Sequence, residues 1–324
     1  MTTDESAVLA ALAACLANGE CPWLCLMVGA VGSSPRPVGT LLAVTPSGFQ
    51  TGSLSGGCVE EDLIARLIGG EFNTRAVQTI EYGVSAEDNM RWGLPCGGRL
   101  TLAIQRLDQR DLTWIYAAQQ AIAKRTVLQR IVERSDGHSA TTHQAEFYAP
   151  EVLAPTISHC FGPRLRLLLI GAGAISAALA ALALATDYEV LVIDSRDWAL
   201  AQWAGPDVEL ILALPDDAIR ARAADKHTAI ITLSHDPRVD DMALLEALET
   251  DAWYVGALGS MRTSEKRRSR LAALGIDDAS LARLHAPVGL PIGSKTPMEI
   301  AIAIMAQLIQ YRRGIPLPRN LRRD

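Results

Sequence analysis

The chain has 324 residues, of which 49% are hydrophobic and 20% are charged, with a net charge of −6 and a pI near 5.6. This composition is typical of a soluble protein with two domains that each bury a core, and its acidic balance argues against a nucleic-acid partner. Six cysteines, at positions 15, 21, 25, 58, 96 and 160, are too sparse for a disulfide scaffold or paired metal knuckles. We therefore expect reduced thiols and a cytoplasmic location.

Two apolar segments imitate membrane signals, and each has another explanation. Residues 7–17 are apolar, but Asp4 and Glu5 precede them where a signal peptide carries positive charge. Residues 167–185 carry no charge, yet they include Gly171-Ala172-Gly173 and are rich in alanine, which indicates a strand turning into a buried helix. We expect no membrane association.

The first half of the chain predicts a small α+β domain over residues 1–148. Apolar residues at helical spacing indicate helices at 4–18, 59–68 and 112–124. Apolar or alternating runs indicate strands at 23–28, 40–44, 49–51, 76–82, 99–106 and 126–133. Residues 134–144 are polar and are interpreted as a surface turn.

A loop of small residues leads directly into the second of these helices. Its glycines permit positive φ and close approach to a ligand, and its hydroxyl and N–H groups are donors; the candidate binding residues are Ser53, Ser55, Gly56 and Gly57. We interpret the loop as a cradle for an anion or a carbonyl. Cys58 follows at the helix N-terminus, where the macrodipole lowers a thiol pKa, so a thiolate there could hold a soft metal or sulfur. The alternative is a glycine turn beside a buried, inert cysteine.

Two other loops carry candidate binding groups. Arg36 stands between two prolines, and this stiff backbone suits bidentate capture of a phosphate or carboxylate. An ordinary surface arginine is the alternative. Cys96 and Gly97 belong to a second glycine-rich loop, at residues 92–98, so we expect a second thiol near the first. Which thiol contacts a metal or its sulfur stays open.

Residues 149–164 contain three prolines and a glycine and are predicted to be an interdomain linker. After them, a strand at 165–170, a glycine turn, a helix at 174–185 and a strand at 189–193 form a βαβ unit. Further strands at 208–212, 228–233 and 253–255 alternate with helices at 197–203, 215–224 and 238–249. The predicted fold is α/β: a doubly wound, Rossmann-like parallel sheet over residues 165–324, preceded by the smaller domain.

The Rossmann-like half predicts a nucleotide site. Gly171, Gly173 and the following helix N-terminus suit a pyrophosphate, and Asp194, about 20 residues further on, suits a ribose hydroxyl. Ser176 takes the place of the third glycine in this pattern. His235 follows a strand at its carboxyl end, where open α/β sheets bind ligands, although a structural histidine is the alternative.

Together these motifs resemble the XdhC/CoxI family along nearly the whole chain. In the first half the matching blocks are Gly32-Ser33-Ser34-Pro35-Arg36, Gly52-Ser53 through Glu60, and Leu94-Pro95-Cys96-Gly97-Gly98. In the second half they are Gly171-Ala172-Gly173, Asp194-Ser195-Arg196, Ser234-His235-Asp236-Pro237, Tyr254 through Ser260, and Ala286 through Ile300. The departures, Ser176, Ser195 and Ser234, concern only the Rossmann half.

The resemblance implies a chaperone that binds the molybdenum cofactor as cargo and inserts it into an enzyme like xanthine dehydrogenase or aldehyde oxidoreductase. It implies protection of the cofactor while a cysteine desulfurase installs the terminal sulfido ligand. Molybdopterin, or its cytosine dinucleotide form, would lie on the donor-rich loop and thiols. A cytidylyltransferase is a further possible partner, and a homodimer stays open. An accessory protein rather than a catalyst is expected, with no resident metal assigned.

Two enzymatic readings compete with this one. An NAD(P)-dependent oxidoreductase fits the glycine turn and Asp194, but its acid–base group would have to be His235 or Lys295, neither of which stands in a convincing motif. A sulfur-transfer enzyme could use Cys58 or Cys96 as nucleophile, yet neither loop contains a neighbouring histidine.

Overall fold

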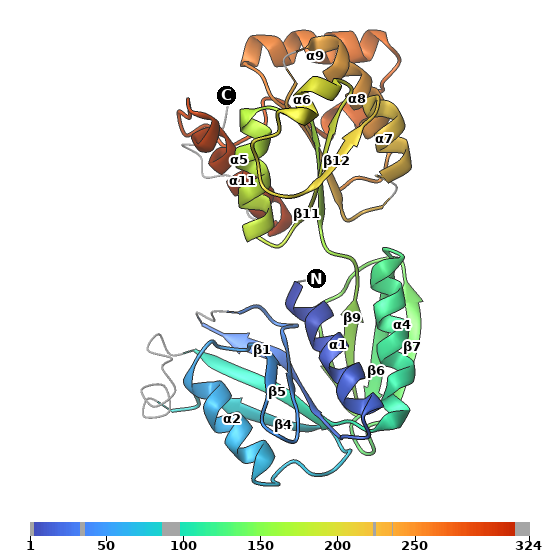
Figure 1. Cartoon of the computed structure of the whole chain (residues 1–324), viewed down its shortest axis with the longest axis vertical. Helices are drawn as coiled ribbons and strands as arrows, with labels where there is room; N and C mark the ends of the chain where they lie inside the picture. The colour runs from blue at the N-terminus through green and yellow to red at the C-terminus, as the bar shows by residue number, and fades with distance from the viewer. Residues whose placement is uncertain (1–2, 33–35, 86–97, 223–224, 235, 315–324) are drawn as a thin grey trace. The chain divides into compact units, whose positions relative to one another are not determined.

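The computed structural model describes residues 3–32, 36–85, 98–222, 225–234 and 236–314. The chain forms two compact units, Met1–Pro163 and Arg164–Asp324 (Figure 1). We call them the N-terminal unit and the C-terminal unit. Among the described residues, none of the helices combines the length and the apolar character needed to cross a membrane.

The N-terminal unit contains a five-stranded antiparallel sheet in the order β3-β2-β1-β5-β4. Its strands are β1 (Trp23–Val31), β2 (Leu41–Val44), β3 (Gln50–Gly52), β4 (Gln78–Tyr82) and β5 (Arg99–Arg106). Successive side chains of β1 point to opposite faces: Leu24 and Leu26 join one core, whereas Cys25 and Met27 join another. Helix α1 (Thr3–Ala17) covers the first face and α2 (Cys58–Ile68) the second. The predicted α+β character of this half is confirmed.

A second antiparallel sheet in this unit was not predicted. Its order is β7-β6-β9-β8, with β6 (Val127–Glu133), β7 (Ser139–Gln144), β8 (Glu151–Leu153) and β9 (Thr156–Phe161). The surface turn expected at 134–144 is therefore largely strand β7. Likewise, the segment expected to be a linker at 149–164 supplies β8 and β9, because β9 pairs with β6 along its length and buries Ile157 and Phe161.

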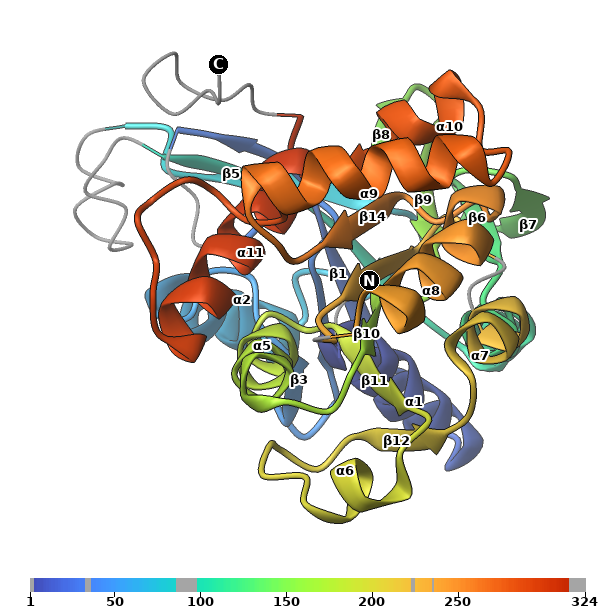
Figure 2. The ribbon, with the colours of Figure 1, turned by 90° about the horizontal axis from the view of Figure 1, so that it is seen from above.

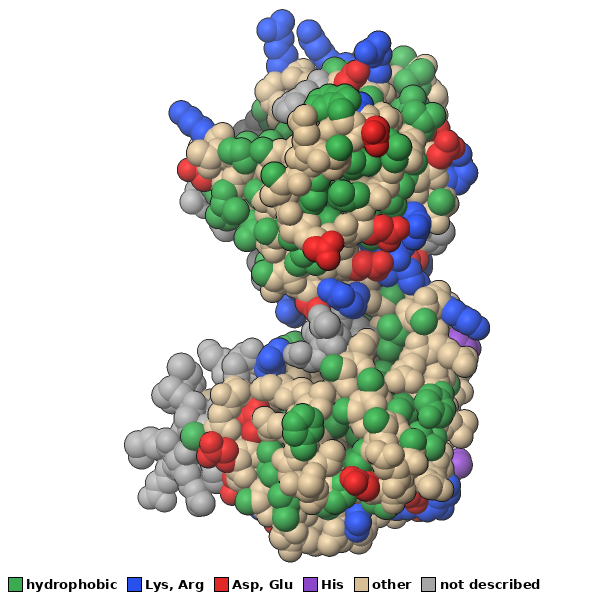
Figure 3. All heavy atoms as spheres, viewed as in Figure 1, with side chains coloured by type: hydrophobic (Ala, Val, Ile, Leu, Met, Phe, Trp, Pro, Cys, Tyr) green, Lys and Arg blue, Asp and Glu red, His purple; other side chains and the backbone are tan. Residues whose placement is uncertain are grey.

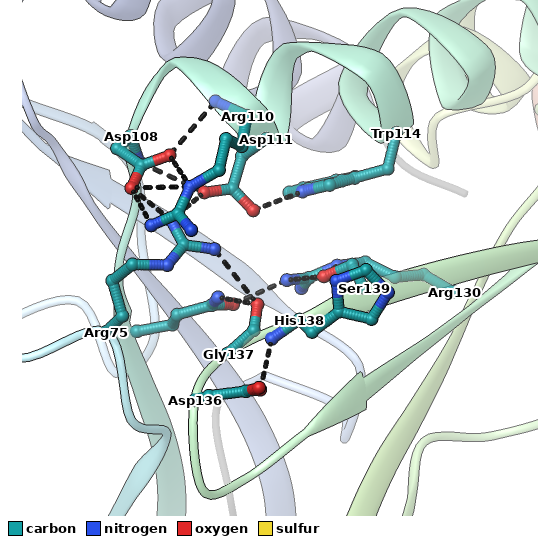
Figure 4. A network of polar contacts seen from close by, with 11 residues as sticks. Arg75, Asp108, Arg110, Asp111, Trp114, Arg130, Asp136, Gly137, His138 and Ser139 are labelled. Atoms are coloured by element: carbon teal, nitrogen blue, oxygen red, sulfur yellow. Dashed lines mark hydrogen bonds and ion pairs between the residues drawn. The ribbon is translucent and has the colours of Figure 1, made fainter.

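An ionic cluster fastens the helix α4 (Leu112–Ala123) and the short 3-10 helix η1 (Gln109–Asp111) to this sheet (Figure 4). Arg75 Nη1 lies 2.7 Å from a carboxylate oxygen of Asp108 and 2.8 Å from one of Asp111. Trp114 Nε1 donates to Asp111 at 2.9 Å, and the Arg130 guanidinium lies 4.0 Å from the centre of the Trp114 ring. Burial lowers the pKa of Arg130 to about 10. We assign this cluster to the fold.

The C-terminal unit is built on a six-stranded parallel sheet in the order β12-β11-β10-β13-β14-β15. The strands are β10 (Arg166–Ile170), β11 (Glu189–Asp194), β12 (Glu209–Leu212), β13 (Thr228–Thr232), β14 (Tyr254–Ala257) and β15 (Leu284–His285). In order along the chain, this is the arrangement 3-2-1-4-5-6 of dinucleotide-binding Rossmann folds. The predicted doubly wound α/β fold is confirmed.

Helices cover both faces of the parallel sheet, which explains why the central residues of β10, β11 and β13 are apolar and buried (Figure 2). One face packs on α5 (Ala174–Ala185) and α11 (Pro297–Arg312). The other packs on a group formed by α7 (Pro215–Arg222), α8 (Pro237–Glu249), α9 (Met261–Ala273) and α10 (Asp278–Ala282). A short helix, α6 (Asp197–Ala201), follows β11. Alternate residues of β10 enter the two cores, so each helical layer is held by its own apolar cluster.

The new strands change which fragment of the N-terminal half we expect to fold alone. A fragment of residues 1–163 contains both sheets, whereas residues 1–148 lack β9, the partner of β6. We predict that 1–163 unfolds cooperatively in urea, and that 1–148 does not, because it loses Ile157 and Phe161 from the core. Circular dichroism during urea titration measures both. A cooperative transition in 1–148 would contradict this assignment of residues 149–163.

Candidate functional site

The glycine-rich loop before α2 encloses a carboxylate of its own chain. Glu60 lies in the first turn of α2 and is only 4% exposed. Its carboxylate accepts hydrogen bonds from four consecutive backbone N–H groups, those of Leu54 at 2.8 Å, Ser55 at 2.7 Å, Gly56 at 2.7 Å and Gly57 at 3.0 Å. The hydroxyls of Ser53, at 2.9 Å, and Ser55 also donate to it. The loop is therefore an anion nest that already holds an anion.

This geometry corrects one part of the sequence interpretation. The N–H and hydroxyl donors of residues 53–57 were expected to face a ligand, whereas the structure directs them to Glu60. The signal for this was present in the sequence, because an acidic residue at the third helical position commonly bonds back to the helix N-cap. The loop fixes the start of α2, and direct binding of a cofactor by Ser53, Ser55, Gly56 or Gly57 stays a prediction.

Hydrogen bonding keeps Glu60 ionised inside the protein. Burial by itself raises the pKa of this carboxyl group, but the bonds from Ser55, Gly56 and Gly57 outweigh it and lower the pKa to about 2, from a usual value of 4.5. Since the pKa is lower in the folded state, the stabilisation is complete above pH 4.5 and is lost as the pH falls toward 2.

We predict that Glu60→Gln lowers the free energy of unfolding by about 3 kcal/mol at pH 7, because a neutral amide cannot accept all of these bonds. The difference from wild type should shrink at pH 3, because part of the stabilisation that ionised Glu60 gives the wild-type protein is already lost there. Urea unfolding at both pH values measures it. Glu61→Gln, at the exposed neighbouring position, is the control and should change little. An equal loss in the two variants would contradict the nest.

Cys58 differs from the other described cysteines in its exposure. It is the first residue of α2 and is exposed, whereas Cys15, Cys25 and Cys160 are buried. Burial raises the pKa of Cys15 to about 12 and raises that of Cys25 and Cys160 as well, so these thiols stay protonated. The alternative of a buried Cys58 is therefore wrong.

Three candidate residues of the N-terminal unit remain, and the structure describes one of them, Arg36. Cys96 and Gly97 lie outside the described residues, so the expected proximity of the two thiols stays a prediction. Arg36 lies half-buried between β1 and β2. Within the described part of the chain, no three His, Cys, Asp or Glu side chains are grouped as a metal site.

In the C-terminal unit, the glycine turn after β10 is forced by a close approach between strand ends. Gly171 has φ +106°, and a Cβ on it would lie 3.0 Å from the backbone nitrogen of Ser234. Gly173 is the N-cap of α5 and has open space where a side chain would stand. Ser176, in place of a third glycine, is fully buried and donates to the Gly171 carbonyl. The predicted turn and helix start are confirmed as structure.

A pocket of about 80 Å³ lies at the carboxyl ends of the central strands. It is lined by Ile170, Gly171, Ile193, Asp194, Ser195, Arg196, Pro215, Ser234, Asp236 and Val239. Whole-ligand pockets in proteins span roughly 300–1,000 Å³, so this pocket is a subsite for one chemical group. Its position is the one at which open α/β sheets bind ligands. His235 lies outside the described residues, although its neighbours Ser234 and Asp236 both line the pocket.

Asp194 is fully engaged within the protein. Its Oδ2 accepts from the Ala172 N–H at 2.8 Å and from Arg196 Nη2 at 2.8 Å. Its Oδ1 accepts from the Arg196 N–H at 3.0 Å and from Arg196 Nε at 2.9 Å. Burial raises its pKa, but the bonds from Arg196 and Ala172 outweigh this and leave the pKa lowered. A carboxylate has about four acceptor positions. In this structure the protein itself occupies these positions, and the role of Asp194 as acceptor for a ribose hydroxyl stays a prediction.

Sequence reasoning missed Arg196 and Trp198. The guanidinium carbon of Arg196 lies 4.9 Å from the centre of the Trp198 ring, and the Trp198 ring is exposed. The spacing of Arg196, two residues beyond the strand-end acid, was the signal available in the sequence.

The strand order, the glycine turn and the subsite define the C-terminal unit as a Rossmann domain. Comparison with family models agrees: a model described as XdhC Rossmann domain matches residues 167–308, and one described as XdhC and CoxI family matches residues 15–83. The chain belongs to the XdhC and CoxI family.

Similar proteins match along nearly the full length. A probable subunit of xanthine dehydrogenase from Bacillus subtilis is 27% identical over 94% of this chain and 97% of that protein. The molybdenum cofactor insertion chaperone PaoD from Escherichia coli is 27% identical over 96% of this chain and 90% of that protein. A crystal structure of a xanthine dehydrogenase from Bacillus halodurans is 25% identical, covers 97% of this chain and 96% of that one, and superposes with a TM-score of 0.74.

Proposed function

We propose that this chain is a molybdenum cofactor insertion chaperone. It binds the cofactor as cargo, protects it while a cysteine desulfurase supplies the terminal sulfido ligand, and delivers it to an apo-enzyme of the xanthine dehydrogenase or aldehyde oxidoreductase type. The observation that carries this proposal is the match to PaoD over 96% of this chain, within a family whose two models match in order along it.

The exposed thiol of Cys58 supports binding of the metal-containing end of the cofactor. Cysteine sulfur is a preferred ligand of soft metal and sulfur centres. Cys58 presents such a sulfur at the surface, from the first residue of an eleven-residue helix. The nest around Glu60 holds this helix start in place. We propose that Cys58 contacts the metal or its sulfido ligand during transfer.

The Rossmann subsite supports binding of the phosphate-containing end of the cofactor. Molybdopterin carries a phosphate, and its cytosine dinucleotide form carries a pyrophosphate. The N-terminus of α5 has no side-chain cap, so its backbone N–H groups suit such an anion, and the subsite lies beside it. We propose that this unit holds the phosphate or nucleotide end of the cofactor. If the dinucleotide is the cargo, a cytidylyltransferase is the expected supplier.

An NAD(P)-dependent oxidoreductase is the second candidate, favoured by the Rossmann strand order. Hydride transfer to a carbonyl also needs a proton donor near neutral pH. Of the carboxyl groups that line the subsite, Asp194 has a lowered pKa and Asp236 has a pKa lowered to about 2 by its bonds with Arg238. Both are ionised at neutral pH and neither donates a proton. The described carboxyl groups of the subsite therefore support binding and delivery, and His235, the other candidate donor beside the subsite, lies outside the described residues.

We predict that the wild-type protein, loaded with cofactor, stimulates activation of an apo-molybdoenzyme of the xanthine dehydrogenase type. Cys58→Ala should lose most of this stimulation and retain less sulfurated cofactor, because the thiol that contacts it is gone. Molybdenum content, fluorescence of the oxidised pterin and the activity of the target enzyme measure these effects.

Cys21→Ala is the matched control, since Cys21 is a partly exposed cysteine of the same unit. Cys21→Ala should keep the wild-type stimulation of the target enzyme and the wild-type retention of sulfurated cofactor. Absence of stimulation by the wild-type protein, together with steady turnover of NADPH and a small carbonyl compound, would decide for the oxidoreductase.

A further inference from the structure

The saturation of Asp194 changes the chemistry of the Rossmann subsite. In Rossmann domains, an acid at the end of the second strand reads a ribose hydroxyl by accepting its hydrogen bond, whereas an arginine nearby accommodates a ribose phosphate. Here the acid is only 4% exposed at its side chain, and its acceptor positions are taken by Ala172 and Arg196. A ligand in the subsite therefore meets the guanidinium of Arg196, which is bonded to Asp194, rather than the Asp194 carboxylate.

Arg196 is held in one orientation on two sides. Its Nε and Nη2 bond to the Asp194 carboxylate, and its guanidinium lies against the ring of Trp198. Its Nη1 makes no hydrogen bond within the described part of the chain, and the side chain is 47% exposed at the edge of the subsite. A fixed planar donor of this kind loses little conformational freedom when it binds a phosphate.

Other donors border the same subsite. Ser195 is exposed and lines it. Gly171 also lines it, and α5 begins three residues beyond Gly171, at Ala174. Asp236 is the opposing charge in the subsite, but its carboxylate is bonded to the backbone and guanidinium of Arg238. Acidic and basic side chains also lie side by side on the face in Figure 3. Directed hydrogen bonds, rather than excess positive charge, would select an anion here.

We propose that Arg196 binds a phosphate monoester of a nucleotide ligand, and that Asp194 is the positioning residue that holds Arg196 for it. This inference rests on the proposed binding of a phosphate or nucleotide group in the Rossmann unit. The ligand class is a nucleotide with a terminal or ribose-linked monoester, in preference to one with an unmodified sugar. The monoester can belong to an NADP-like dinucleotide or to a cytidine nucleotide.

The test compares two pairs of probes that each differ by one phosphate monoester: NADP with NAD, and CMP with cytidine. Calorimetry on the full-length protein should show tighter binding of the phosphorylated member by roughly tenfold to a hundredfold, the range expected for a charge-assisted hydrogen bond. The pair with the larger ratio identifies the source of the phosphate.

Arg196→Gln should abolish the ratio, and Arg196→Lys should leave a reduced one, because lysine keeps the charge but loses the planar fork. Asp194→Asn should also reduce the ratio. We expect it to lower the unfolding midpoint, because a buried carboxylate that accepts four hydrogen bonds is replaced, and a cooperative unfolding transition shows that the variant is folded. Arg110→Gln is the matched control: Arg110 bonds to Asp108 in the same way, two residues along, but both residues belong to the N-terminal unit and do not line the subsite. It should keep the wild-type ratio.

Equal binding within both pairs by the wild-type protein would overturn the proposal, as would an Arg196→Gln variant that folds and keeps the preference. Cofactor delivery is measured separately, by activation of the apo-molybdoenzyme. A chaperone that activates its target without preferring phosphorylated probes would refute this role of Arg196 alone. A protein that shows the preference without activating a target would refute the proposed function alone.

Discussion

Each candidate site contains a buried carboxylate that accepts hydrogen bonds from the backbone N–H groups of a glycine-rich turn. These bonds determine the shape of the site. Glu60 accepts four backbone N–H groups of the loop before α2, and Asp194 accepts the Ala172 N–H of the turn after β10. An ionised carboxylate is costly to bury unless it is hydrogen-bonded, so each turn is held closely around its acid. The neighbouring groups that each site presents to a ligand include the thiol of Cys58 and the guanidinium of Arg196.

These two groups differ in the chemistry that they can recognise. A thiol is a soft ligand, suited to a metal–sulfur centre, whereas a planar guanidinium suits phosphate oxygens. The molybdenum cofactor combines a soft metal with a phosphate at the far end of the pterin. The chain carries an exposed thiol in its N-terminal unit and, in its C-terminal unit, the subsite that we propose for a phosphate.

The Rossmann strand order by itself does not decide between binding and catalysis. The carboxyl groups of the subsite are Asp194 and Asp236, and each is paired with an arginine two residues further along the chain. This pairing lowers both pKa values and removes both groups as proton donors at neutral pH. The arginine pairing therefore excludes these two carboxyl groups, among the described residues of the subsite, as general acids at neutral pH.

The sequence by itself determined the parallel sheet, its glycine turn and most helices, because these depend on local apolar periodicity and on glycine and capping signals close together in the chain. It did not reveal strand β9, since Pro155 and Pro163 flank it and its partner β6 lies more than twenty residues earlier. It also placed the donors of residues 53–57 and the acceptor Asp194 toward a ligand. Only the tertiary structure decided that these donors bond to Glu60 and that Asp194 accepts from Arg196. Residue types specify which groups can hydrogen-bond, whereas the folded backbone specifies which groups meet.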